Sequence, residues 1–78
     1  MENYHLEFIL HVIDTPIEQV KSSLAEFGEN LQIMDCQEEE SRGQNLKVKI
    51  ETEDPTVIFD LCSQFGRIKS VKINEAKA

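Results

Sequence analysis

Few side chains in this sequence could do chemistry, and they fall in three places. His5, Glu7 and His11 alternate with apolar residues near the start of the chain. Asp14 opens an Asp-Thr-Pro-Ile stretch, and two cysteines, Cys36 and Cys62, follow further along. No serine of the sequence lies in a Gly-x-Ser-x-Gly stretch, and the three glycines of the chain form no glycine-rich phosphate loop. We therefore expect no catalytic residue, no cofactor and no enzymatic activity.

The histidines and Glu7 are the first candidates for a metal site. His5 and Glu7 are two residues apart, so a strand would place both side chains on one face. His11 would lie about 20 Å from His5 along an extended strand and cannot join them. Because zinc needs three or four convergent ligands, we expect no metal site and interpret the three residues as exposed on a sheet face.

Cys36 and Cys62 show neither Cys-x-x-Cys spacing nor histidines at metal spacing. We interpret both as free thiols that serve as small apolar residues in or near the core. A functional cysteine is the alternative, but it would need neighbours that lower the thiol pKa, and none is near in the sequence.

Two similar segments predict the helices that position these residues. "DTPIEQVKSSLAEFG" (14–28) and "EDPTVIFDLCSQFG" (53–66) both begin with an acid close before a proline and end in Phe-Gly. In the first, Thr15 is expected as N-cap, Pro16 as the first helical residue and Glu18 as the partner in a capping box. Its apolar stripe is Ile17, Val20, Leu24 and Phe27, and Gly28 is expected to end it as a left-handed cap.

The second segment repeats this logic. Asp54 is expected to cap the helix, Pro55 to occupy its first turn and Gly66 to end it. Its apolar stripe is Ile58, Leu61, Cys62 and Phe65. We expect Phe27 and Phe65 both to be buried against the sheet.

Strand-like runs flank each helix, at residues 4–13, 31–37, 46–51 and 69–74. Three of them alternate, with one face formed by Tyr4, Leu6, Phe8, Leu10 and Val12, by Leu46, Val48 and Ile50, and by Val71 and Ile73. The second run has apolar residues of both parities (Leu31 and Ile33 against Met34 and Cys36), which a bulge or an edge position would explain. The order predicts one α+β domain over residues 1–78 with the ferredoxin-like βαββαβ fold: a four-stranded antiparallel sheet with two helices on one face.

The two halves are joined by "EEESRGQN" (38–45), which we expect to be a hairpin loop. Its acidic run is most simply a solvated loop. Magnesium or calcium binding there is a weaker alternative, because the spacing of a calcium-binding loop is missing.

Composition limits the class of partner. The 78 residues carry 15 acids and 8 bases, for a net charge of −7, and are 40% hydrophobic. Phosphates would repel such a chain on average, so we expect no nucleic acid partner, and an anionic membrane surface is disfavoured for the same reason. The sequence has no apolar run long enough for a bilayer and does not begin like a signal peptide, so a cytoplasmic location without membrane insertion is expected.

Nearly the whole chain resembles the ACT domain, a small regulatory module attached to many enzymes of amino-acid metabolism. The resemblance is carried by "FILHVIDTPI", which matches a hydrophobic strand followed by Asp-x-Pro-Gly, by Gly28-Glu29-Asn30-Leu31, by "VKIETED" and by "IKSVKI". It implies a regulatory module that senses an amino acid or another small molecule. The ligand-binding residues that it implies are Asp14, Thr15, Pro16, Ile17 and Asn30.

Two alternatives to ligand sensing stay open. The family's glycine after the proline is Ile17 here, and a β-branched side chain would obstruct the approach of a ligand to the backbone. Asp14 and Asn30 are also common turn residues for backbone reasons alone. An ACT-like module also forms the cytosolic C-terminal domain of MgtC-type bacterial membrane proteins, so the alternative hypothesis is an interaction domain of a larger protein without a small ligand.

Self-association is the remaining expectation. ACT-like domains pair edge to edge or helix to helix, and the second strand would lie at a sheet edge with Met34 among its apolar residues. The sequence and the resemblance together predict a homodimer formed by this strand and the first helix. Contacts with other domains of a parent protein are the alternative.

Overall fold

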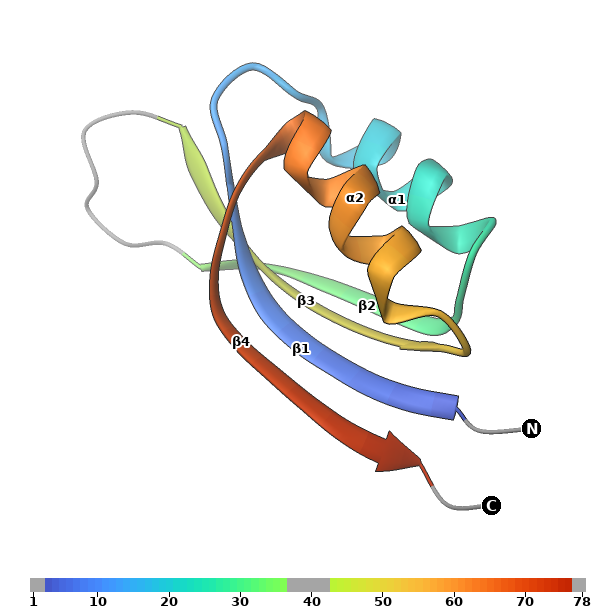
Figure 1. The fold of residues 1–78 in the computed structure, drawn as a ribbon. Coiled ribbons are helices and arrows are strands. Elements are labelled where there is room, and N and C mark those ends of the chain that lie inside the picture. The colour runs from blue at the N-terminus through green and yellow to red at the C-terminus, as the bar shows by residue number, and fades with distance from the viewer. Residues whose placement is uncertain (1–2, 37–42, 77–78) are drawn as a thin grey trace.

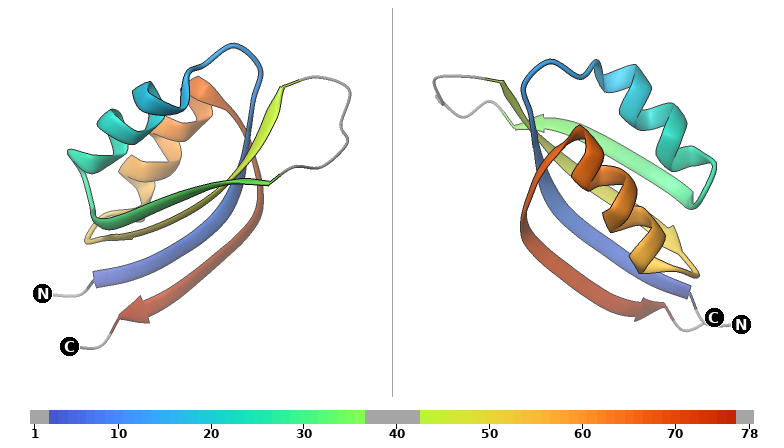
Figure 2. Two further views of the ribbon diagram at one scale, coloured as in Figure 1. Left: turned by 180° about the vertical axis from the view of Figure 1, so that it is seen from behind. Right: turned by 45° about the horizontal axis from the view of Figure 1, so that its top comes forward.

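The computed structural model describes residues 3–36 and 43–76, and Figure 1 shows its strands and helices. In chain order they are β1 (Asn3–Val12), α1 (Ile17–Ala25), β2 (Glu29–Cys36), β3 (Gln44–Thr52), α2 (Pro55–Phe65) and β4 (Gly66–Ala76). The four strands form one antiparallel sheet, and both helices cover the same face of it (Figure 2). The predicted α+β ferredoxin-like fold is confirmed.

The strand order is β2-β3-β1-β4, so β1 and β3 are central and β2 and β4 form the edges. Each helix connects a central strand with an edge strand, which is the double crossover that the duplicated sequence predicts. The hairpin expected at residues 38–45, with its acidic run and the alternative of a metal site, lies mostly outside the described residues, as does Gln37 at the end of the predicted second strand.

The core lies between the helices and the central strands. The predicted alternation of β1 and β3 is confirmed, because every second residue is buried beneath the helices: Leu6, Phe8, Leu10 and Val12 on β1, and Leu46, Val48 and Ile50 on β3. The helices contribute Val20, Leu24, Ile58 and Cys62. The ring of Phe8 meets that of Phe59 edge to face, with centroids 5.6 Å apart, an arrangement that adds to the burial of both rings.

Two predictions about the ends of α1 are wrong. Pro16, not Thr15, is the N-cap, with extended backbone and no side-chain capping bond, so no capping box forms. The helix ends at Ala25, with Glu26 as its C-cap. Phe27 therefore lies beyond the last helical turn, where it cannot continue the apolar stripe, and 47% of its surface is exposed.

The predicted start of α2 is confirmed. The Asp54 carboxylate accepts a hydrogen bond from the backbone N–H of Thr56 at 3.1 Å, and Pro55 occupies the first turn. Phe65 is half-buried against the core, so its predicted burial is only partial. Gly66 ends the helix with extended backbone (φ 178°).

Steric approach explains the glycines that end the two helical segments, since neither Gly28 nor Gly66 has the left-handed backbone expected of Gly28. A Cβ on Gly66 would lie 1.9 Å from the carbonyl oxygen of His11, and one on Gly28 would lie 2.5 Å from the Ile50 side chain. Both positions therefore exclude a side chain because a neighbouring strand passes too close.

Both edge strands contain a bulge. The register of β2 against β3 shifts between Glu29 and Gln32, and Asn30 there has φ 53°. The bulge and the edge position that could explain the irregular second strand are thus both present. In β4, the two residues Ser70 and Val71 stand opposite the single residue Phe8, and Ser70 has φ 54°. Such a bulge exchanges the faces of all residues that follow it.

Neither helix in residues 3–36 and 43–76 has the length and apolar composition needed to cross a bilayer.

Candidate functional site

The turn between β1 and α1, together with the first residue of α1, holds four of the five residues that the sequence predicts as ligand-binding. Asp14 and Pro16 are exposed, whereas Thr15 and Ile17 are half-buried. The Thr15 hydroxyl donates to the carbonyl oxygen of Phe65 at 3.3 Å, which ties the turn to the end of α2. The Pro16 carbonyl accepts from the backbone N–H groups of Gln19 and Val20 and starts the helix. Ile17 packs against the core. Thr15, Pro16 and Ile17 thus all have structural roles.

Asn30, the fifth residue, lies at the other end of α1. Its left-handed backbone explains an asparagine here, because this residue tolerates that conformation better than most. Its side-chain amide donates to the carboxylate of Glu51 on β3. The hydrogen bond and the backbone together show that Asn30 shapes the turn into β2.

The two parts of the predicted ligand site do not converge within the single chain. Ile17 begins α1, and Asn30 lies beyond the far end of that helix, near the start of β2. Nine helical residues at 1.5 Å each extend about 13 Å. A molecule the size of an amino acid cannot span that distance. Ligand binding by these five residues stays a prediction.

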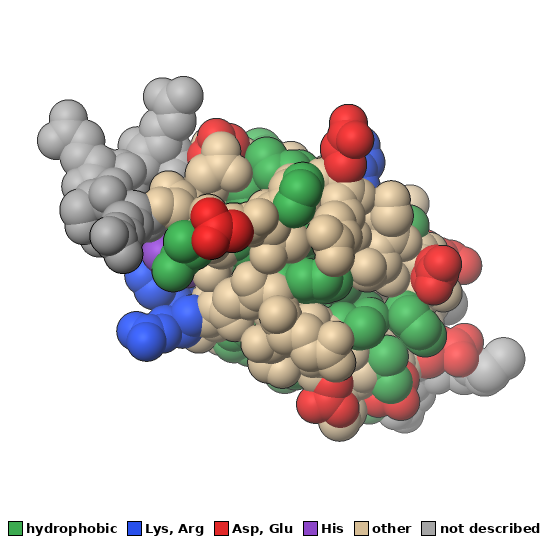
Figure 3. All heavy atoms as spheres, turned by 90° about the horizontal axis from the view of Figure 1, so that it is seen from above, with side chains coloured by type: hydrophobic (Ala, Val, Ile, Leu, Met, Phe, Trp, Pro, Cys, Tyr) green, Lys and Arg blue, Asp and Glu red, His purple; other side chains and the backbone are tan. Residues whose placement is uncertain are grey.

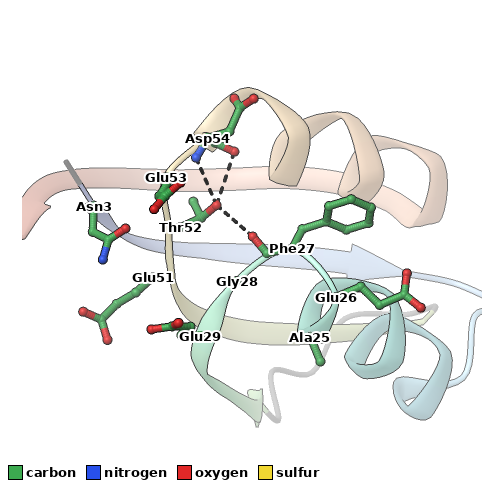
Figure 4. Close-up of a pocket in the computed structure, with 10 residues that line it drawn as sticks. All are labelled: Asn3, Ala25, Glu26, Phe27, Gly28, Glu29, Glu51, Thr52, Glu53 and Asp54. Atoms are coloured by element: carbon green, nitrogen blue, oxygen red, sulfur yellow. Dashed lines mark hydrogen bonds between the residues drawn. The ribbon is translucent and has the colours of Figure 1, made fainter. Parts of the chain in front are cut away.

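A surface hollow of about 590 Å³ lies where the α1–β2 turn meets the β3–α2 turn. Figure 4 shows Thr52 at its centre, with its hydroxyl donating to the carbonyl oxygen of Phe27 at 2.9 Å and accepting from the backbone N–H of Asp54 at 3.1 Å. The sequence patterns did not predict this hollow. The predicted topology contained the signal for it, because it brings both turns to the same end of the sheet.

Half of the residues that line the hollow are acidic: Glu26, Glu29, Glu51, Glu53 and Asp54. They come from the two turns and from the adjoining ends of β2 and β3, and Figure 4 shows that several of the side chains point outward. Within the described part of the chain, no three His, Cys, Asp or Glu side chains come together as a metal ion would require. We therefore describe the hollow as a surface depression lined by negatively charged side chains.

His5, Glu7 and His11 lie on the sheet face opposite the helices, as expected. His5 Nε2 is 3.2 Å from the Glu51 carboxylate, and His11 Nδ1 is 2.8 Å from the side-chain oxygen of buried Asn45. The Glu7 carboxylate lies 3.8 Å and 3.6 Å from the amines of Lys47 and Lys49. The three residues thus interact with three different partner sets on β3.

Cys62 is a free, fully buried thiol on the core side of α2. Burial raises its pKa to about 12, because an apolar environment disfavours the thiolate. A protonated and inaccessible thiol is a poor nucleophile. The core interpretation is confirmed for Cys62, whereas the Cys36 side chain lies outside the described part of the structure.

Comparison with known proteins adds one match. Residues 2–78 match the model of the FakA-like middle domain family, in which FakA denotes a fatty acid kinase subunit. The family description names neither the ACT domain nor an MgtC-type protein, so those resemblances stay predictions. Among curated proteins, no match to the chain is found.

Proposed function

The chain belongs to the FakA-like middle domain family, and on this premise we propose that it is a non-catalytic interaction and regulatory module that self-associates. The observation that carries the proposal is the exposed apolar side chain on edge strand β2, Met34, with 51% of its surface exposed. An unpaired strand edge presents free backbone donors and acceptors to another chain. The module would act in the cytoplasm as one domain of a larger protein.

The family description refers to a fatty acid kinase, and phosphoryl transfer needs a phosphate cradle with Mg²⁺ ligands. The proposal assigns those parts to other domains of the larger protein. The role left to a middle domain is to hold protomers or neighbouring domains in position. The fold supports this role, because its sheet has two edges and one face that the helices do not cover.

Self-association is proposed to use β2 together with α1, which packs beside it. Sedimentation equilibrium at tens of micromolar should give twice the 9.0 kDa mass of the single chain. Met34→Lys should weaken the dimer, because a charge would then be desolvated at the pairing edge. Ile13→Lys is the matched control, since Ile13 is 62% exposed, lies after β1 and should leave the dimer intact.

A monomer at all concentrations would refute self-association. An equal loss with both variants would place the interface away from β2.

Ligand sensing is the second candidate, and the resemblance to ACT domains is what favours it. The separation of Ile17 from Asn30 argues against a site within one protomer. An NMR titration with a panel of amino acids and with Mg²⁺ tests this candidate. Shifts confined to residues 14–17 and Asn30 would support sensing, and their absence would leave interaction as the function.

A further inference from the structure

The sheet face that the helices leave uncovered has a composition unlike that of the whole chain. Strand register defines this open face, because residues directly opposite each other in an antiparallel pair point to the same side. Its members are Asn3, His5, Glu7, Ile9 and His11 of β1, Asn45, Lys47, Lys49 and Glu51 of β3, Glu29, Gln32 and Met34 of β2, and Arg67, Lys69, Lys72 and Asn74 of β4.

The open face is basic although the chain is acidic. It carries five of the eight Lys and Arg residues of the chain and only three of the fifteen Asp and Glu residues. Of the described residues that lie elsewhere, eight are acidic and only Lys21 is basic. Figure 3, which looks at the molecule from the helical side, shows acidic side chains spread over that surface. Among the described residues, charge is thus segregated between the open face and the rest of the surface.

The β4 bulge helps to create this segregation. Lys69 and Lys72 are three residues apart, so a regular strand would direct them to opposite faces. The additional residue at Ser70 restores Lys72 to the side of Lys69, and the register confirms it, because Lys69 pairs with Ile9 and Lys72 with Glu7. The left-handed backbone of Ser70 therefore serves to align the basic residues of β4 on one face.

Part of this charge is not paired with an acidic side chain among the described residues. Glu7 lies near Lys47 and Lys49 on the central strands, and Glu51 is occupied by His5 and Asn30. Arg67, Lys69 and Lys72 are exposed, and none of them forms an ion pair with another described residue. The positive charge without an ion-pair partner among the described residues therefore lies along β4.

We propose that the open face docks an acidic protein surface, such as a negatively charged helix of another domain of the larger protein. This inference rests on the proposed interaction function and names the chemistry of the partner. Opposite charge favours the encounter and fixes its orientation. Ile9 supplies apolar contact between Lys47 and Lys69, its neighbours on β3 and β4.

Other anionic partners fit the face less well. None of its members is Phe, Tyr or Trp, so it offers no such ring on which bases of a nucleic acid could stack. It also has no projecting cluster of large apolar side chains to enter a membrane, and a net charge of −7 opposes the approach of the whole chain to anionic lipid.

The test uses a synthetic helical peptide of about 20 residues that contains Glu, Ala and Leu, with its affinity for the chain measured by fluorescence anisotropy. Binding should weaken with added salt, since screening reduces the attraction between exposed charges. Lys69→Glu should weaken it about fivefold, because one attraction becomes a repulsion. Lys21→Glu on α1 is the matched control: it makes the same change in net charge on the helical side and should alter affinity less than twofold.

Parallel measurements use single-stranded oligouridylate and phosphatidylglycerol vesicles. Tighter binding to either one, no peptide binding, or equal effects of the two variants would overturn the proposal. If Lys69→Glu does not fold, Lys69→Gln removes the charge alone and should still reduce affinity. Sedimentation equilibrium measures self-association separately, so failure of the docking proposal and failure of the proposed dimer are distinguishable.

Discussion

Thr52 and Phe27 are joined by a hydrogen bond although 25 residues separate them: the Thr52 hydroxyl lies 2.9 Å from the Phe27 carbonyl oxygen and donates to it. The same hydroxyl accepts from the backbone N–H of Asp54. One buried side chain thus connects the end of β3 to both the turn after α1 and the start of α2. These hydrogen bonds explain why Thr52, with its polar hydroxyl, occupies a position that is only 4% exposed.

Thr52→Val should destabilise the domain by about 1–3 kcal/mol, because it preserves shape but leaves the Phe27 carbonyl and the Asp54 N–H without this partner. Thr56→Val is the matched control, since Thr56 is exposed on α2 and its change should cost at most about 0.5 kcal/mol. Urea unfolding measures both. Equal costs would show that the Thr52 hydroxyl does not hold the two turns.

The two phenylalanines Phe8 and Phe27 should respond very differently to truncation. Phe8 is 1% exposed and packs against Phe59, so Phe8→Ala should cost about 3–5 kcal/mol. Phe27 is 47% exposed, so Phe27→Ala should cost less than about 1 kcal/mol. Thermal unfolding of the two variants compares them directly. A larger loss from Phe27 would mean that its ring packs against the core after all.

The wrong prediction for Phe27 shows which features of the fold a sequence pattern cannot reveal. The alternation in β1 and β3 predicts the core correctly, because these central strands are covered by helices on one face and the face of each residue follows from its parity. The end of α1 depends instead on a contact between distant segments: Gly28 must pass close to Ile50. A helical spacing that happens to include Phe27 cannot reveal that contact.

The basic charge of the open face could likewise not be predicted from the total charge of the chain. A net charge of −7 describes the average surface, whereas the basic face depends on strand register and on the bulge at Ser70. Irregular residues in β2 indicated an edge or a bulge, but the sequence of β4 gave no comparable sign. The predicted ligand residues Asp14 and Asn30 flank the predicted first helix, so their separation already followed from the sequence. The observed α1 is shorter than expected and still keeps them apart.

Cys62 should make the stability of the domain fall at high pH. Its pKa rises from an ordinary value of 9.0 to about 12 on burial. Between these values the unfolded chain loses the thiol proton while the folded chain retains it, so increasing pH favours unfolding. The stabilising effect of the buried neutral thiol is complete below about pH 9 and is lost progressively as the pH rises toward 12.

Cys62→Val isolates this effect, because it preserves an apolar side chain that does not titrate. Chemical denaturation between pH 7 and pH 11 should show a steeper loss of stability for the unaltered chain than for the variant. Parallel curves would contradict the high pKa. In a Cys36→Ser background, labelling of Cys62 with a thiol reagent should also be slow in the folded state and fast in urea.

Gly66→Ala should destabilise the domain by about 3 kcal/mol. The backbone of Gly66 is extended, so its φ causes no strain for alanine. The cost comes from the new Cβ, which would lie 1.9 Å from the carbonyl oxygen of His11 and 3.2 Å from Cα of Val12. These are backbone atoms of β1, and they cannot withdraw without disturbing the pairing of β1 with β4.

Ser70→Gly provides the opposite case on the same strand: φ is 54° there, so glycine relieves an unfavourable conformation and should leave stability unchanged or raise it by up to about 1 kcal/mol. Urea midpoints that shift in the same direction by similar amounts would contradict both assignments.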